Sequence, residues 1–233
     1  HMSVLNRMVE KIATNLQRWG DSHTVTHKTL ALFYELANSH SSTRLMLTSN
    51  SINLILANHT EAHFQFMAVP SNGRLRTLYY AILGRLLTFD DMKARWEAFM
   101  APFDITWARL GAGLQEAVAN PAKLNDPDLQ RMAVGLFRDL RGIIDAALSP
   151  RAYNWFFDWI YPTHFPVIQR CMEVWWHNKK VTSPILKFLS ELSYNKSQRL
   201  VFNPSSPNGI LLFREASQLI CMFGNNVMQP AYS

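Results

Sequence analysis

Two histidines four positions apart are the residues in this chain that most resemble a catalytic motif. His59 and His63 stand in the string His59-Thr60-Glu61-Ala62-His63, and histidines at this spacing on a helix can share a zinc ion. In the zinc proteases a glutamate directly follows the first histidine, whereas Glu61 lies two places on and no third ligand is indicated. His23 and His27 repeat the spacing without any carboxylate between them. We therefore expect no metal at either pair.

Motifs that bind a nucleotide or activate a nucleophile are also missing. The sequence has no phosphate-binding G-x-x-x-x-G-K-[ST] loop, no G-x-G-x-x-G turn and no G-x-S-x-G elbow. Acidic pairs such as Asp90-Asp91 stand at expected helix starts, where carboxylates favour the positive end of the helix dipole. We expect no catalytic, cofactor-binding or metal-binding residues, and a protein that is not an enzyme.

A basic segment near the C-terminal end is the strongest charge bias in the sequence. Within 21 positions it has five bases and one acid, Glu191, which gives a local net charge of +4. The bases are Lys179, Lys180, Lys187, Lys196 and Arg199. They form either a solvated set of helix ends and loops or a docking surface for an acidic protein. The net charge of the whole chain, +6, would suit an acidic protein, nucleic acid or an anionic membrane, and does not choose among them.

Other conspicuous side chains have structural interpretations. The aromatics of residues 153–161 and the pair Trp175-Trp176 are expected mostly to pack in a core, although interleaved bases could let such a cluster stack on nucleobases. Cys171 and Cys221, inside apolar helical patterns, are interpreted as buried free thiols. Arg138 and Arg141, with alternating charges on one helix, are expected to tie neighbouring helices together.

The elements that position these residues are amphipathic helices. Apolar residues recur at steps of three or four in several segments, the first being Leu5, Met8, Val9, Ile12, Leu16 and Trp19 before Gly20. Asp126-Pro127, Ser183-Pro184 and Ser206-Pro207 place a capping side chain before a proline, which predicts helix starts near 127, 184 and 207. Pro102 is expected to kink a long helix. No segment has the alternation of a strand, so the predicted class is all-α.

Consecutive helices pair into hairpins that begin near residues 4, 42, 91, 163 and 208, with a short extra helix over 153–160. This spacing of roughly 40–50 residues predicts an irregular HEAT-repeat α-solenoid of about five antiparallel helix pairs. A closed helix bundle is the alternative, because periodicity does not determine how helices pack. We interpret residues 1–2 as a probable tag remnant and residues 3–233 as a HEAT-repeat segment of a longer solenoid. No signal peptide or membrane span is indicated, so an intracellular protein is expected.

Several strings resemble the exportins, nuclear transport receptors of the karyopherin-β (importin-β) superfamily. They are Ile82-Leu83-Gly84-Arg85-Leu86-Leu87, Asp139-Leu140-Arg141-Gly142-Ile143, Trp159-Ile160-Tyr161-Pro162, Asn195-Lys196-Ser197-Gln198-Arg199-Leu200 and Ser205-Ser206-Pro207-Asn208-Gly209-Ile210-Leu211-Leu212-Phe213-Arg214-Glu215. The last is the most specific because it is long and unusual in composition. The resemblance covers most of the chain and is weakest between residues 105 and 128.

The resemblance implies a central fragment of a HEAT-repeat receptor that shuttles between nucleus and cytoplasm through the nuclear pore complex. The implied partners are folded cargo proteins, nuclear pore proteins and the GTP form of Ran, which would contact repeats outside this fragment. GTP would be carried by Ran, so no cofactor is implied for this chain. The runner-up is a HEAT-repeat scaffold in a non-transport assembly. Nucleic acid is a weaker alternative partner, and no membrane is expected.

Overall fold

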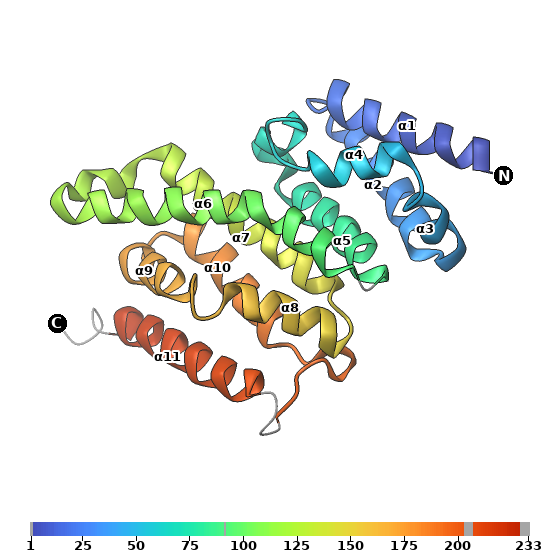
Figure 1. Ribbon diagram of the computed structural model, residues 1–233. Helices are drawn as coiled ribbons and strands as arrows, with labels where there is room; N and C mark the ends of the chain where they lie inside the picture. Colours follow the sequence, from blue (N-terminus) through green and yellow to red (C-terminus); the bar gives the residue numbers. More distant parts are fainter. Residues whose placement is uncertain (1, 91, 203–206, 229–233) are drawn as a thin grey trace. The chain divides into compact units, whose positions relative to one another are not determined.

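The computed structural model describes residues 2–90, 92–202 and 207–228, and within these ranges the chain folds into helices with no strand (Figure 1). The α-helices are α1 (Met2–Arg18), α2 (His23–Asn38), α3 (His40–Met46), α4 (Asn50–Ala57), α5 (Gly73–Phe89), α6 (Lys93–Ala119), α7 (Pro127–Ala146), α8 (Pro150–Ile160), α9 (Phe165–Trp175), α10 (Lys179–Ser193) and α11 (Asn208–Met228). Short 3-10 helices are η1 (Gln65–Ala68), η2 (Pro70–Asn72), η3 (Pro121–Asn125) and η4 (Lys196–Gln198). The all-α prediction is confirmed.

Helix starts follow the capping chemistry with one exception. Helix α7 begins at Pro127 as predicted, and the side chain of Asp126 accepts a hydrogen bond from the backbone N–H of Asp128 at 2.9 Å. The predicted start near 184 is wrong, because Asn178 caps α10 five residues earlier and Pro184 lies inside the helix. A proline there removes one backbone hydrogen bond, but the apolar face continues through it. The start predicted near 207 is found at Asn208, while Ser206 lies outside the described residues.

The predicted hairpin starts agree with the helices, although the pairs are uneven. Each predicted start lies within two residues of the first residue of α1, α3, α6, α9 or α11. The hairpin predicted to start near residue 42 begins with two short helices, α3 and α4. Helix α6, by contrast, continues through Pro102 to Ala119, and the predicted extra aromatic helix is α8.

The chain divides into two compact units. Unit 1 consists of residues 1–102 and 138–146, and unit 2 of residues 103–137 and 147–233. Helices α6 and α7 contribute residues to both units. None of the helices in the described ranges is both long and apolar enough to cross a membrane.

Unit 1 is built around α2, which packs against α1 and α5. Its core is aliphatic with aromatic additions, and its fully buried members include Val9, Ile12, Leu30, Phe33, Tyr79, Ile82, Leu86 and Ile143. Two glycines allow α5 and α7 to approach closely. A Cβ atom on Gly84 would lie 2.8 Å from the Cβ of Ala146, and one on Gly142 would overlap the carbonyl oxygen of Thr77. These mid-helix glycines therefore mark places where two helices touch.

Unit 2 is built around α9, which packs against α10 and α11, and α10 also contacts α11. Its core is rich in aromatics, as the sequence predicts, and buried members include Trp107, Phe137, Tyr153, Phe156, Phe157, Trp175 and Phe188. Because these rings pack on one another, the cluster belongs to the core and is not a platform for nucleobases.

Candidate protein-interaction surface

Helix α10 carries the three lysines that begin the predicted basic segment. The side chain of Asn178 caps the helix by accepting a hydrogen bond from the backbone N–H of Lys180 at 3.1 Å. Lys179, Lys180 and Lys187 are exposed, and the last two stand two turns apart on one side of the helix. The helix buries its other side through Val181, Thr182, Pro184, Ile185, Phe188, Leu189 and Leu192. Core packing thus presents the three lysines, which we call the α10 lysines, to solvent.

The α10 lysines make no ion pair with another described residue. Lys179 and Lys180 occupy the first turn of the helix, where the positive end of the helix dipole repels an ammonium group. Such a position costs roughly 0.3–1 kcal/mol for each charge. The lysines and the dipole therefore combine to make this end of α10 electropositive, and both would favour an anionic group placed there.

Arg199 must be removed from the predicted docking set because its side chain is fully buried, with 0% exposure. Its guanidinium donates hydrogen bonds to the carbonyl oxygens of Ala147 and Tyr194, both at 3.1 Å, and forms an ion pair with Glu191 at 3.3 Å. It also lies over the ring of Tyr153, 5.3 Å from the ring centre. Arg199 therefore joins the chain that follows α10 to the start of α8 and is not available to a partner.

Lys196, the remaining predicted docking residue, lies in η4 and is half-buried. Glu191, the one acid of the segment, forms its ion pair with the buried Arg199. The pattern of charges in the sequence could not reveal this pairing, because it depends on how the chain returns after Ser193. The exposed charge of the segment is consequently carried by lysines alone.

A buried ion-pair cluster in unit 1 contains charges that the sequence argument did not connect. Arg76 donates to the two carboxylate oxygens of Asp139 at 2.5 and 2.7 Å, and to Glu61 at 2.8 Å. Burial raises the pKa of Asp139 to about 6, although Arg76 opposes this shift. The bidentate pair links α5 to α7, which is the tying role predicted for Arg138 and Arg141 in the same string. The residue that performs it is Asp139.

The histidine pair is separated by the fold. His59 is buried in unit 1, where its Nε2 lies 2.9 Å from the carbonyl oxygen of Phe99 and its Nδ1 lies 3.2 Å from the hydroxyl of Tyr80. Since a carbonyl only accepts, Nε2 carries the proton of the neutral ring. Burial lowers the pKa of His59 to about 4, against the opposing effect of the Phe99 hydrogen bond. His63 is exposed, and both residues lie beyond the end of α4 and not on a helix.

Unit 2 contains a second histidine that is held in place by its neighbours. His164 stacks on Trp107 with a ring separation of 5.1 Å, and its Nε2 lies 3.1 Å from a carboxylate oxygen of Asp104. The indole N–H of Trp159 donates to the same oxygen at 2.9 Å. The arrangement joins α6, α8 and the start of α9. Throughout the described ranges, no three His, Cys, Asp or Glu side chains come together to form a metal site.

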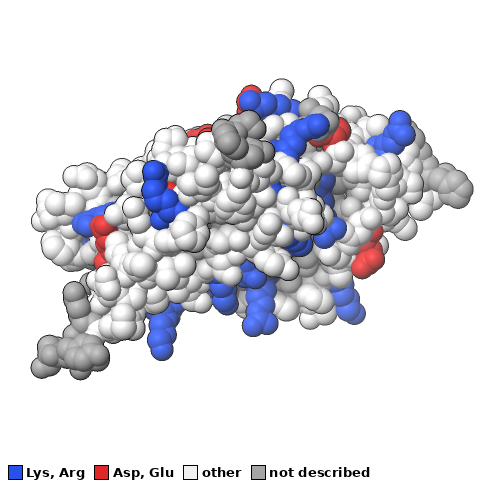
Figure 2. Space-filling view, turned by 90° about the horizontal axis from the view of Figure 1, so that it is seen from below, with Lys and Arg blue, Asp and Glu red and all other residues white. Residues whose placement is uncertain are grey.

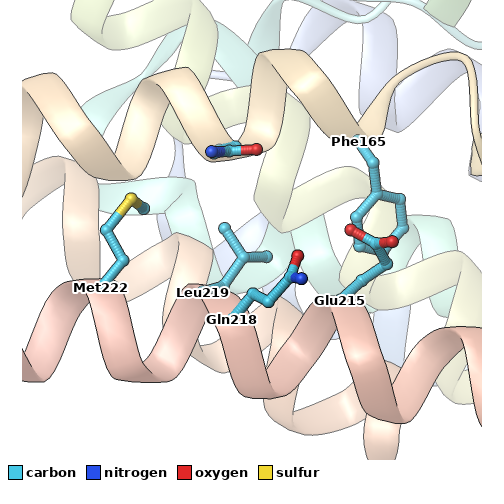
Figure 3. Close-up of a pocket in the computed structure, with 6 residues that line it drawn as sticks. Phe165, Glu215, Gln218, Leu219 and Met222 are labelled. Atoms are coloured by element: carbon cyan, nitrogen blue, oxygen red, sulfur yellow. The ribbon is translucent and has the colours of Figure 1, made fainter.

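A groove between α9 and α11 is a feature that sequence reasoning missed (Figure 3). It encloses about 340 Å³ and is lined by Phe165, Gln169, Glu215, Gln218, Leu219 and Met222. In Figure 3 Phe165 points from α9 toward Glu215 on α11. Glu215 forms an ion pair with Arg214 at 2.6 Å. Most of the exposed lining of the groove is apolar, and its one carboxylate is paired with Arg214. The groove therefore suits contact with another protein segment better than acid–base chemistry.

The outer side of α11 is apolar as well. Leu219 is buried, but Ile210, Phe213 and Ile220 are exposed, Phe213 by 72%. Figure 2, seen from below the view of Figure 1, shows Lys, Arg, Asp and Glu side chains as separate groups on a surface made mostly of other residues. The sequence contained the signal, since two apolar series run along α11, but it did not say which series is covered.

The two cysteines differ in their surroundings. Cys171 is fully buried in α9, and burial raises the pKa of its thiol. Cys221 is exposed on α11, so the prediction of a buried thiol is correct for Cys171 and wrong for Cys221. The apolar residues around Cys221 predicted a buried position, but they belong to the exposed outer side of α11.

Comparison with known proteins finds sequence similarity to proteins named Exportin-7 or Ran-binding protein. Residues 1–75 match the family model described as "Exportin-7-like, TPR domain". The chain is 40% identical to Exportin-7-B of Xenopus laevis and 38% identical to Ran-binding protein 17 of Homo sapiens, in each case over 97% of this chain and 21% of that protein. It is 34% identical to Exportin-7 of Dictyostelium discoideum over 100% of this chain and 23% of that protein. No solved structure matches the chain.

The chain spans about a fifth of the length of these relatives. The family model that covers its first third is named for helix-pair repeats, which agrees with the succession of packed helices in both units. The similarity extends through the basic segment and α11 to nearly the whole sequence. Over nearly its whole length this chain is therefore similar in sequence to one segment of proteins named Exportin-7 or Ran-binding protein 17.

Proposed function

We propose that this chain is part of a Ran-dependent nuclear transport receptor of the exportin type, which binds folded cargo proteins and carries them through nuclear pores. The observation that carries the proposal is the 34–40% identity over nearly the whole chain to proteins named exportin-7 or Ran-binding protein 17. Residues 3–233 would be one helical-repeat segment of that longer receptor. Its contribution is to hold proteins, without catalysis.

The helical architecture supports this role through its mechanics. Helix pairs that contact only their neighbours can each yield slightly, and small rotations add up along a repeat protein. Partners bound far apart on such a receptor can thereby influence each other's affinity. In this proposal Ran brings GTP and binds parts of the receptor outside this chain, while cargo and nuclear pore proteins are the other partners. The receptor would move between nucleus and cytoplasm.

The test uses the full-length protein that contains this segment. It is immobilised and exposed to a cell extract with Ran loaded with a GTP analogue, with Ran loaded with GDP, or without Ran, and bound proteins are identified by mass spectrometry. We expect one set of proteins to be retained with Ran–GTP and lost without it. A set of partners that ignores the state of Ran would instead indicate a scaffold in a non-transport assembly and refute the proposal.

For this segment we propose that the α10 lysines, together with Lys196 in η4 beyond the C-terminal end of α10, dock an acidic protein partner. Their exposure, the lack of ion pairs at the α10 lysines and the dipole of α10 support this. Replacing Lys179, Lys180 and Lys187 by Glu in the full-length receptor should weaken such a partner. The change should not unfold the protein, because two of the new carboxylates would favour the helix dipole.

A matched control is available in unit 1, where Arg18, Lys28 and Arg44 are exposed bases. Replacing these three by Glu changes the net charge by the same amount. We expect binding of the acidic partner to fall by about tenfold or more in the α10 variant and to change much less in the control. Equal losses in both variants would show that only total charge matters. Unchanged binding in the α10 variant would mean that the lysines are solvated surface residues that do not bind the partner.

A further inference from the structure

Helix α11 carries two apolar series, and only one of them is covered. The covered series follows steps of three and four through Gly209, Leu212, Ala216, Leu219 and Phe223, of which the first four are buried. One residue further along, the same steps recur through Ile210, Phe213, Ser217, Ile220, Gly224 and Val227. We call this second set the outer seam. Its large members are exposed by 49–72%.

The outer seam has the composition of a helix-packing surface. It contains no charged residue, and its spacing of three and four is that of residues that meet a neighbouring helix. Large side chains alternate with the small residues Ser217 and Gly224, which would let another backbone come close. The outer seam therefore has the same kinds of residues at the same spacing as the covered series, which packs against α9 and α10.

Gly224 provides an independent reason to expect a close neighbour. A glycine inside a helix weakens the helix relative to alanine. Gly84 and Gly142 offset this cost because another helix touches each of them. At Gly224, however, an added Cβ would meet only the side chain of Met228, at 4.0 Å, in otherwise open space. Apart from Met228 and the adjoining backbone of α11 itself, no described residue comes within 4 Å of the position that a side chain at Gly224 would occupy.

We infer that the outer seam is the docking site of a helix from the part of the longer polypeptide that lies outside this chain. The relatives are about five times as long as this chain, so a further segment of the same polypeptide is the occupant with the highest effective concentration. An uncharged seam also fits a permanent intramolecular contact better than a transient one, whose interface would be more polar. The inference rests on the part of the proposed function that makes this chain a piece of a longer receptor. It does not depend on cargo or Ran.

Cys221 allows the docking to be measured directly. It follows Ile220 and is exposed beside the outer seam, whereas Cys171 is buried and serves as an internal reference. The two thiols are alkylated in the chain described here and in the full-length protein, and each site is followed by peptide mass spectrometry. We expect the alkylation rate of Cys221 to be lower by about tenfold or more in the full-length protein, because a docked helix would limit access of the reagent to the thiol. Equal rates in the two proteins would overturn the inference.

Two variants sharpen the measurement. Gly224→Leu fills the space for the docked helix and should restore the reactivity of Cys221 in the full-length protein, whereas Asn225→Leu, at an exposed position outside both series, should leave it protected. If protection of Cys221 appears in the short chain and rises with its concentration, the occupant is a second copy and the inference is wrong. The assay needs no Ran, so it can succeed or fail independently of the transport proposal.

Discussion

Acid should destabilise this protein through His59 in a way that can be isolated by one substitution. Its pKa is lowered from an ordinary value of 6.5 to about 4 by burial, so the unfolded chain binds a proton more readily than the folded one. The stability that follows is present above pH 6.5 and is lost as the pH falls toward 4. The shift of 2.5 units corresponds to about 3.4 kcal/mol in full, of which about 2 kcal/mol is lost between pH 7 and pH 5.

The matched variant is His59→Gln, whose amide can still donate to the carbonyl oxygen of Phe99 but does not titrate. It should be less stable than the original chain at pH 7, because the ring contacts with Tyr80 and Phe99 are lost. The difference between the two proteins should then shrink by about 2 kcal/mol at pH 5, since only the original chain has an imidazole at position 59 that binds a proton on unfolding.

The free energy of unfolding is measured by urea denaturation followed by circular dichroism at several pH values. Burial also lowers the pKa of His164, so both proteins lose stability from that residue, and the comparison between them cancels its effect. A difference between the two proteins that stays constant from pH 7 to pH 5 would refute the reasoning. It would mean that the ring of His59 can take up a proton without leaving its buried position.

Three further outcomes follow from the packing. Replacing Arg199 by Met should lower the free energy of unfolding by about 3 kcal/mol, measured by urea denaturation, because a buried ion pair and its carbonyl contacts are broken. Gly142→Ala should lower the melting temperature because its Cβ meets a facing backbone, whereas Gly224→Ala should leave it unchanged or raise it in this chain. An equal effect at both glycines would contradict this. One thiol, that of Cys221, should react with a thiol reagent in the folded chain, and Cys171 should react only after unfolding.

The helices themselves could be predicted from the sequence because their signals are local. Apolar residues at steps of three and four, and capping residues such as Asp126 before Pro127, act within one or two turns of the chain. The hairpin starts and the all-α class follow from these signals. The failure at Pro184 has a physical reason, since local sequence does not distinguish a proline that begins a helix from one that the helix tolerates a turn later.

Burial and pairing were decided by contacts between distant parts of the chain. Arg199 and Lys187 are both bases in one short segment, yet the chain after α10 folds back and encloses one of them while the other stays exposed. Asp139 forms an ion pair with Arg76, which is 63 positions away in the sequence, and no local pattern predicts such a pair. On α11 the two apolar series are nearly identical in the sequence, and only the packing of α9 and α10 shows which one is covered. The sequence alone thus determined the helices and the family resemblance, and the tertiary structure decided which of their side chains can meet a partner.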